Sequence, residues 1–227
     1  GMFVSSTRSP IFKTAFEAAS RTITDSMPIR MRAGIKGPLL VECYDSQNLF
    51  SGYGVQVLEA LRQFEAEPLV GNLRIRMQAL SKSAYGYLAP GNLDYLLVRA
   101  RARGDTSVGM LGQAAAKMLN ILPILRGGQG KTEAVAKVRG VAAARQHILN
   151  LARRELGKGL LAPFVAVSYS GPTEDVEALP EYKALVQEAT PKNVLVTLQE
   201  MAPTNSVNAG ANSLSIGFMS APHEATL

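Results

Sequence analysis

The stretch LRGGQGKTEA, from Leu125 to Ala134, decides how this chain folds, because it is compatible with two different structures. Glycines followed by Gly-Lys-Thr are typical of a phosphate-binding loop, whereas glycines between two apolar runs are typical of a β-hairpin. The phosphate-binding loop G-x-x-x-x-G-K-[ST] requires a glycine at position 125, where this chain has leucine. We therefore predict a hairpin with one strand at Ile121–Leu125, a solvent-exposed turn at Gly127–Gly130 and a return strand to Val138.

A second feature argues against a phosphate-binding loop. The apolar run LLVECYD ends in an acidic residue suited to Mg²⁺, but it precedes the loop instead of following it. The segment TEAVAKVRG after the loop forms either a return strand or a weak helix, and Gly140 ends it in both cases. A nucleotide-binding enzyme that uses residues 127–132 remains an alternative to be tested.

The composition of the 227 residues narrows the class of protein. No apolar run is long enough to cross a bilayer, and the N-terminus lacks the regions of a signal peptide. The single cysteine, Cys43, fits a reducing cytoplasm. The net charge is +6, but the densest arginines, at positions 99, 101 and 103, would point in different directions on a helix. We therefore expect a cytoplasmic protein with no transmembrane segment and no nucleic-acid partner.

Apolar strands alternate with amphipathic helices along the chain, and this alternation predicts an α/β fold. A strand at Met2–Ser5 precedes a helix that Ser9 caps and Pro10 opens. The remaining elements follow from apolar spacing: strands at 38–46, 163–171, 193–201 and 214–220, and helices at 51–64, 70–80, 93–103, 107–119, 141–156 and 175–189, the last split at Pro180. The short aromatic stretch Ser83–Asn92, broken by proline and glycine, is the predicted domain boundary.

Residues with catalytic chemistry are sparse. His147 is expected on the polar face of a helix and His223 in a frayed tail, and neither has companions at metal-ligand spacing. No motif assembles a nucleophile with a base. We therefore expect a protein that is not an enzyme and that holds no metal and no cofactor.

Four segments together resemble the DegV family of bacterial fatty-acid-binding proteins. They are VSSTRSPIFKTAFEAA at 4–19, ECYDSQNLFSGYGVQVLEA at 42–60, the run from NLDYLL to KVRG at 92–140, and the run from FVAVSYSG to LSIGF at 164–218. The first is similar to the family's Ser-Ser-x-x-Ser-Gly-Thr motif and the second to its Val-Ile-Asp-Ser strand. The third is similar to the family's tyrosine helix and hairpin, and the hairpin falls at the glycines of 127–130.

The resemblance implies two DegV-like α/β subdomains with a ligand cleft between them. Residues 1–82 would be the remainder of the first domain and residues 83–227 the second. It also implies a carrier that binds a long-chain fatty acid and presents the acyl carboxylate to a separate fatty acid kinase subunit for phospholipid synthesis. The fatty acid would be a ligand and not a cofactor.

The chain departs from the family pattern in several places. Nothing matches the family's N-terminal segment, which includes a threonine that helps to hold the ligand carboxylate. Pro10 and Ile11 stand where the family has Gly-Thr, Asn208 where many members have histidine, and Arg99-Ala100-Arg101 where the family has Gly-Gly-Arg. The unmatched N-terminal segment and the altered Pro10-Ile11 favour a second alternative, an interaction or structural protein that has kept the fold and lost the ligand.

The head-group site is expected at the start of the first long helix, because a helix N-terminus attracts anions. Ser9 caps this terminus and Ser6 lies just before it. Arg139 and Asn208 would close the site from the second domain. The expected ligand-binding residues are therefore Ser6, Ser9, Arg139 and Asn208.

Overall fold

The computed structural model describes residues 2–6, 10–66, 70–102 and 119–226. The strands are β1 (Met2–Val4), β2 (Cys43–Asp45), β3 (Ala84–Ala89), β4 (Ile121–Gly128), β5 (Lys131–Arg139), β6 (Phe164–Tyr169), β7 (Leu195–Glu200) and β8 (Leu214–Met219). The helices are α1 (Ile11–Arg32), α2 (Phe50–Ala66), α3 (Val70–Ser81), α4 (Leu93–Ala102), α6 (Val141–Lys158), α7 (Glu174–Glu177), α8 (Pro180–Ala189) and α9 (Pro203–Ala209), with a short 3₁₀ helix η1 (Thr190–Lys192).

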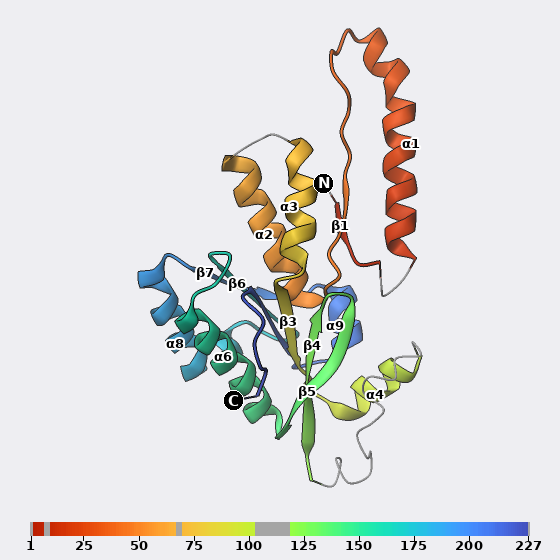
Figure 1. The fold of residues 1–227 in the computed structure, drawn as a ribbon. Coiled ribbons are helices and arrows are strands. Elements are labelled where there is room, and N and C mark those ends of the chain that lie inside the picture. Colours follow the sequence, from red (N-terminus) through yellow and green to blue (C-terminus); the bar gives the residue numbers. More distant parts are fainter. Residues whose placement is uncertain (1, 7–9, 67–69, 103–118, 227) are drawn as a thin grey trace.

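A six-stranded sheet in the order β5-β4-β3-β8-β6-β7 forms the body of the molecule (Figure 1). Neighbouring strands are antiparallel except for β6 and β7, which run parallel. The fold is therefore the expected α/β class, with a mixed sheet. The predicted strands at 163–171, 193–201 and 214–220 are confirmed as β6, β7 and β8, and the predicted helix at 141–156 as α6.

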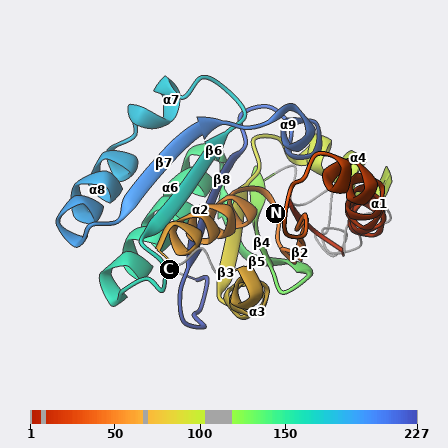
Figure 2. The same ribbon diagram turned by 90° about the horizontal axis from the view of Figure 1, so that it is seen from above.

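Helices cover both faces of this sheet. On one face, Ile148, Leu149 and Leu156 of α6 pack in a core with strand residues that include Tyr87 and Ile216. On the other face, α2 lies across β3, β8 and β6 (Figure 2). Strand side chains alternate between the two faces, so residues two apart on one strand contact the same helix layer.

The central strand β3 corrects the interpretation of the sequence. Ser83–Asn92 was expected only as a boundary, yet Ala84–Ala89 is a strand with all six residues buried. A strand buried on both faces shows no polar alternation, and Gly86 and Pro90 add turn signals, so periodicity did not reveal it. The division of the chain at residues 82 and 83 stays a prediction.

A row of glycines explains how α2 approaches the sheet. Gly127, Gly86 and Gly217 are register partners on β4, β3 and β8. A Cβ atom built on Gly52 of α2 would stand 2.7 Å from the Gly86 Cα atom. The first turn of α2 therefore rests directly on the backbone of β3 and β8, which only glycine allows.

The N-terminal part forms a smaller layered unit. β1 and β2 pair as a two-stranded parallel sheet, and Phe3 stacks on Tyr44 with ring centroids 4.9 Å apart. The strand predicted at 38–46 is shorter, because only Cys43–Asp45 is paired. Pro10 flanks α1 and Ile11 is its first residue, one position later than expected. The helix predicted at 107–119 lies almost wholly outside the described residues.

The C-terminal tail is anchored, which corrects the expectation that His223 lies in a frayed end. His223 Nε2 lies 2.7 Å from the Tyr87 hydroxyl, and its ring packs on Tyr85 and Phe218. His147 lies on α6 as expected, but its Nε2 contacts the Ala225 carbonyl oxygen at 2.9 Å. Both histidines therefore help to hold the tail against the sheet.

Candidate functional site

An apolar cluster lies on the face of the sheet that also carries α2. Its core joins strand residues Leu88 and Leu125 to α4 and α9, and Phe50 of α2 packs against it. The buried members are Leu88, Leu96, Leu97, Ala100, Leu125, Met201 and Ala209. These side chains form a continuous apolar core between two helices and two strands.

A cavity of about 20 Å³ adjoins this cluster. It is lined by Leu49, Phe50, Gly86, Tyr87, Leu88, Leu125, Gly127 and Thr132. The Thr132 hydroxyl is buried and has no hydrogen-bond partner within the described ranges. Ligand pockets usually measure about 300–1,000 Å³, so this apolar slot is closed in the structure and a ligand must displace side chains to enter it.

The loop between β2 and α2 joins this slot to the end of β1. The Asp45 carboxylate accepts hydrogen bonds from the Ser6 N–H at 2.9 Å, the Ser6 hydroxyl at 2.6 Å and the Gln47 N–H at 3.1 Å. The Gln47 carbonyl oxygen in turn accepts from the Gly130 N–H at 2.8 Å. Ser6 therefore already binds a carboxylate, namely that of Asp45.

A larger cavity, of about 590 Å³, lies beside the C-terminal tail and is mainly polar. Its wall includes Arg126, Glu133 and His223. The Arg126 guanidinium donates to Glu133 and to the His223 carbonyl oxygen, so its charge is already compensated. Burial lowers the pKa of His223, and the nearby Arg126 adds to this effect. A charged wall of this kind does not suit an acyl chain.

The family model described as "Uncharacterised protein, DegV family" matches residues 1–221. The chain belongs to the DegV family. A DegV domain-containing protein of Xanthomonas axonopodis pv. citri is 37% identical over 220 residues, which cover 97% of this chain and 70% of that relative. A DegV domain-containing protein of Xanthomonas campestris pv. campestris is 37% identical over 221 residues, again 97% and 70% of the two chains.

Solved DegV structures share the fold. A stearic-acid-binding protein from Eubacterium ventriosum matches with a TM-score of 0.69 at 19% identity, over 96% of this chain and 69% of its own. DegV of Bacillus subtilis, a fatty-acid-binding protein, matches with a TM-score of 0.65 at 18% identity, over 96% and 68%. A DegV family protein from Eubacterium eligens, loaded with heptadecanoic acid, matches with a TM-score of 0.66 at 13% identity, over 96% and 72%.

The hairpin predicted from the DegV resemblance is confirmed. Strands β4 and β5 pair up to Gly128 and Lys131, and the turn consists of Gln129 and Gly130, both at positive φ. Gly127 and Gly128 belong to β4, so the turn is shorter than predicted. Lys131 begins a strand and not a helix, so the loop lacks the helix N-terminus that a phosphate-binding loop uses.

Asn208 lies on α9 beside the apolar cluster. Its Oδ1 accepts from Arg99 Nη2 at 3.0 Å and its Nδ2 donates to the Thr204 carbonyl oxygen at 2.8 Å. Arg99 Nε is buried and finds no hydrogen-bond partner within the described part of the chain. Arg99 thus places a guanidinium next to Asn208, where the DegV pattern has glycine.

The expected site residues are not gathered in one place. Arg139 pairs with Ile121 at the end of the β4–β5 hairpin opposite its turn. At about 3.3 Å per residue, the nine positions from Gly130 to Arg139 extend about 30 Å. The turn lies beside the loop that binds Ser6, so Ser6 and Arg139 are at opposite ends of the hairpin. Ser9 lies outside the described residues.

Sequence reasoning missed three residues of this region: Asp45, Arg99 and Thr132. Asp45 was visible as part of the DegV-like Asp-Ser motif, but its contact with Ser6 spans 39 positions. Arg99 was noted only as a departure from the family pattern. Thr132 could not be found from the sequence, because it lines the slot together with Leu49 and Phe50, which are more than 80 positions away in the chain.

No helix among the described residues is long and apolar enough to cross a membrane. Across the same ranges, no group of three or more His, Cys, Asp or Glu side chains is arranged to hold a metal ion.

Proposed function

We propose that this chain binds a long-chain fatty acid and does no chemistry on it. The observation that carries the proposal is the apolar cluster of α4, α9, β3 and β4, with its narrow slot over Gly86 and Gly127. Membership of a family whose solved members include proteins with bound stearic and heptadecanoic acid supports the same ligand class.

The acyl tail would enter the slot by displacing Phe50 and then follow the buried leucines of the cluster. Each buried methylene contributes about 0.8 kcal/mol before the cost of association. On this face Asn48 and Leu49 cover Gly86, whereas Gly127 leaves room for a Cβ atom, whose nearest neighbour would be Asn48 Oδ1 at 3.6 Å. A straight saturated chain would therefore lie across β3 and β4, between α4 and the hairpin.

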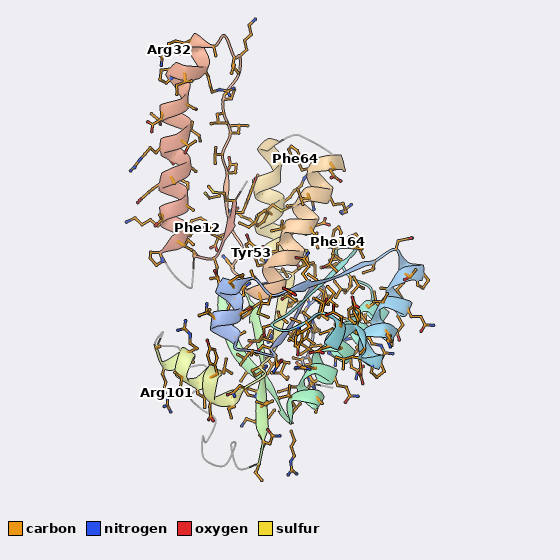
Figure 3. The ribbon with its side chains drawn as sticks, turned by 180° about the vertical axis from the view of Figure 1, so that it is seen from behind. Phe12, Arg32, Tyr53, Phe64, Arg101 and Phe164 are labelled. Carbon is orange, nitrogen blue, oxygen red and sulfur yellow. The ribbon has the colours of Figure 1, made fainter. Side chains whose placement is uncertain are left out.

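The carboxylate would lie at the N-terminal end of α1. Figure 3 shows Phe12 at the end of α1 that faces α9 and α4, and Arg32 at the far end. Pro10 makes no side-chain cap, and the first turn of α1 has no acidic residue. Such a helix end attracts an anion through its backbone N–H groups and its dipole. We propose Ser6, Ser9 and Asn208 as residues near this head group, whereas Arg139 lies at the far end of the β4–β5 hairpin, where salt screens its charge from this site.

We further propose that the protein is a cytoplasmic carrier that presents the acyl carboxylate to a separate ATP-dependent kinase subunit. The ligand cleft would lie between residues 1–82 and residues 83–227 as two subdomains. A carboxylate held at a helix end near the surface, with the tail buried, would be accessible to a partner enzyme. Adding a fatty acid kinase subunit with ATP tests this step, since acyl-phosphate formation should require the loaded chain.

Native mass spectrometry and titration with a fluorescent fatty acid test the binding itself. The informative variant is Gly127→Ala, because its added Cβ would lie 3.6 Å from Asn48 Oδ1, an ordinary contact that the fold accepts. The methyl group fills the slot, and one methyl group in an apolar pocket changes affinity by about tenfold or more. Gly157→Ala in α6 is the matched control, because nothing lies within 4 Å of its added Cβ.

Weaker binding in Gly127→Ala alone supports the slot, and equal affinity in both variants contradicts it. No binding in the wild type favours the second candidate, an interaction protein with the DegV fold. The observation that favours this candidate is the occupation of the Ser6 donors by Asp45, which leaves fewer donors for a ligand.

A further inference from the structure

Four residues lie side by side in one row across the six-stranded sheet, on the face that carries α2. Gly217 of β8 pairs with Gly86 of β3, and Gly86 pairs with Gly127 of β4. Gly127 in turn pairs with Thr132 of β5. Residues that are directly opposite on antiparallel strands direct their side chains to the same face of the sheet. Counted from β8 toward β5, Thr132 is therefore the first member of this row with a side chain on the α2 face.

The cover over this row opens toward β5. The backbone of α2 rests directly on Gly217. A Cβ atom built on Gly86 would stand 2.9 Å from the Leu49 carbonyl oxygen, which is also too close for a side chain. A Cβ atom built on Gly127 would have its nearest neighbour at 3.6 Å, an ordinary contact. The row is therefore closed at β8 and β3, and the apolar slot reaches Thr132 from β4.

Thr132 brings an unpaired hydroxyl to this slot. Its Oγ1 atom is buried and makes no hydrogen bond within the described part of the chain. The other lining residue with a polar side chain is Tyr87, whose hydroxyl lies 2.7 Å from His223 Nε2 and whose ring packs in the core on the opposite face. The remaining lining residues are leucines, a phenylalanine and glycines. The Thr132 hydroxyl is therefore the one unpaired polar side-chain group among the described residues of an otherwise apolar slot.

An unpaired hydroxyl at this position destabilises the folded chain. A buried hydroxyl gives up its hydrogen bonds to water, and without a new partner this loss is not compensated. Valine has the same branched shape, suits a strand equally well, and already stands at Val135 and Val138 of β5. Valine at position 132 would avoid the cost. We infer that the hydroxyl serves a partner that enters the slot.

We propose that the slot selects a fatty acid with a hydroxyl group on its acyl chain, and that Thr132 binds this hydroxyl. The inference rests on the proposed function and defines its ligand class more closely. Each of the two hydroxyl groups can donate or accept, so they form a hydrogen bond in either direction. The rest of the acyl chain packs against Phe50 and the leucines of the slot, as an unsubstituted chain would.

The chemistry of the slot favours a hydroxyl over the carboxylate head group at this position. None of the described residues that line the slot carries a positive charge. An ionised carboxylate in apolar surroundings is strongly disfavoured unless a cation or several donors compensate its charge. A neutral hydroxyl requires far less, and the single hydrogen bond to Thr132 offsets much of its loss of water. The carboxylate therefore stays outside the slot, and Thr132 recognises an oxygen further along the chain.

Displacement of a bound fluorescent fatty acid from the full chain tests the proposal. The competitors are stearic acid and a set of stearic acids that each carry one hydroxyl at a different position. We expect one hydroxyl position to bind about tenfold more tightly than stearic acid, because its hydroxyl pairs with a buried group that stearic acid leaves unpaired. The other positions should bind more weakly than stearic acid, because they bury a hydroxyl among leucines without a partner.

Thr132→Val separates this role from a purely structural one. The variant should bind stearic acid at least as tightly as the wild type does, and the preferred hydroxylated acid about tenfold more weakly. Thr132→Ser keeps the hydroxyl and should keep the preference. Thr197→Val is the matched control, because Thr197 lies on β7 at the opposite edge of the same sheet and does not line the slot. This control should leave both affinities unchanged.

The outcomes distinguish this inference from the proposed function. If the wild type binds stearic acid but binds no hydroxylated acid more tightly, the inference is overturned and the proposed function stands. The same holds if Thr132→Val retains the preference of the wild type. If the wild type binds neither the fluorescent fatty acid nor any of the stearic acids, the proposed function fails and the inference fails with it.

Discussion

Gly217 on β8 lies directly beneath Ser51 of α2, and a Cβ atom built on Gly217 would stand 2.1 Å from the Ser51 carbonyl oxygen. The obstacle is backbone and not a flexible side chain, so an added methyl group must push α2 off the sheet. We expect Gly217→Ala to lower the free energy of unfolding by about 1–3 kcal/mol or more. Urea denaturation measures this, with Gly157→Ala as the control. Equal stability of the two variants would show that α2 does not rest on this strand.

Asn48 connects the loop before α2 to the central strand. It is 3% exposed, its Nδ2 donates to the Ala84 carbonyl oxygen at 2.7 Å, and its Oδ1 accepts from the Leu49 N–H at 2.9 Å. Asn48→Asp replaces the donor with a buried carboxylate oxygen that faces a carbonyl. We expect a loss of at least about 2 kcal/mol near neutral pH, smaller in acid, where the protonated carboxyl donates again.

The matched control for Asn48→Asp is Asn92→Asp. Asn92 is exposed and its Oδ1 accepts from the Tyr95 N–H at 2.9 Å, a capping role that aspartate performs equally well. Chemical denaturation of both variants should show a loss only at position 48. A similar change at both positions would contradict the role given to Asn48.

His223 should make stability depend on pH. Burial lowers its pKa below the ordinary 6.5, and the charges of Arg126 and Arg154 act in the same direction, while the hydrogen bond to Ala221 and the charge of Glu155 oppose it. The unfolded chain therefore takes up the proton first, so stability is full above pH 6.5 and falls as the pH drops from there toward the lowered pKa.

Replacing His223 with a residue that does not titrate should remove the loss of stability that its protonation causes below pH 6.5. In His223→Gln, the loss of thermal stability between about pH 7.5 and about pH 5 should be smaller than in the wild type. Glu155 and Glu188 also have lowered pKa values, but they titrate below 4.5 and leave this window unaffected. An unchanged pH profile in the variant would rule out His223 as its source.

Asp45 should oppose the binding of an anionic head group, because its negatively charged carboxylate accepts both hydrogen bonds that Ser6 could donate to a ligand. Asp45→Asn removes that charge and releases the Ser6 hydroxyl. We expect the affinity for a fluorescent fatty acid to rise about threefold to tenfold. Adding Ser6→Ala to Asp45→Asn should cancel part of the gain, and Ser9→Ala alone should weaken binding. Equal affinity in all these variants would move the head group away from this loop.

Lys131 should be dispensable. It is exposed at the first position of β5. Lys131→Ala should change the free energy of unfolding by no more than about 0.5 kcal/mol and should keep the fatty-acid affinity. Saturable ATP binding that this substitution abolishes would restore the nucleotide-binding alternative.

Elements with a clear period were predictable from the sequence. α6 shows apolar residues at helical spacing, and Ile148, Leu149, Ala152 and Leu156 are buried as the pattern indicates. The hairpin was predictable from the missing glycine at position 125. By contrast, β3 is buried on both faces and α9 is a single short segment, so neither has a period to detect. Whether Ser6, Ser9, Arg139 and Asn208 bind a ligand stays a prediction.

The sequence by itself determined the α/β class, the hairpin and the family, because periodicity, turn residues and motif order are local properties of the chain. Only the tertiary structure decided which residues meet. The pairing of Gly86 with Gly217, the carboxylate of Asp45 on Ser6 and the packing of His223 on Tyr85 join segments far apart in sequence. Such contacts depend on sheet order and register, which no local pattern encodes.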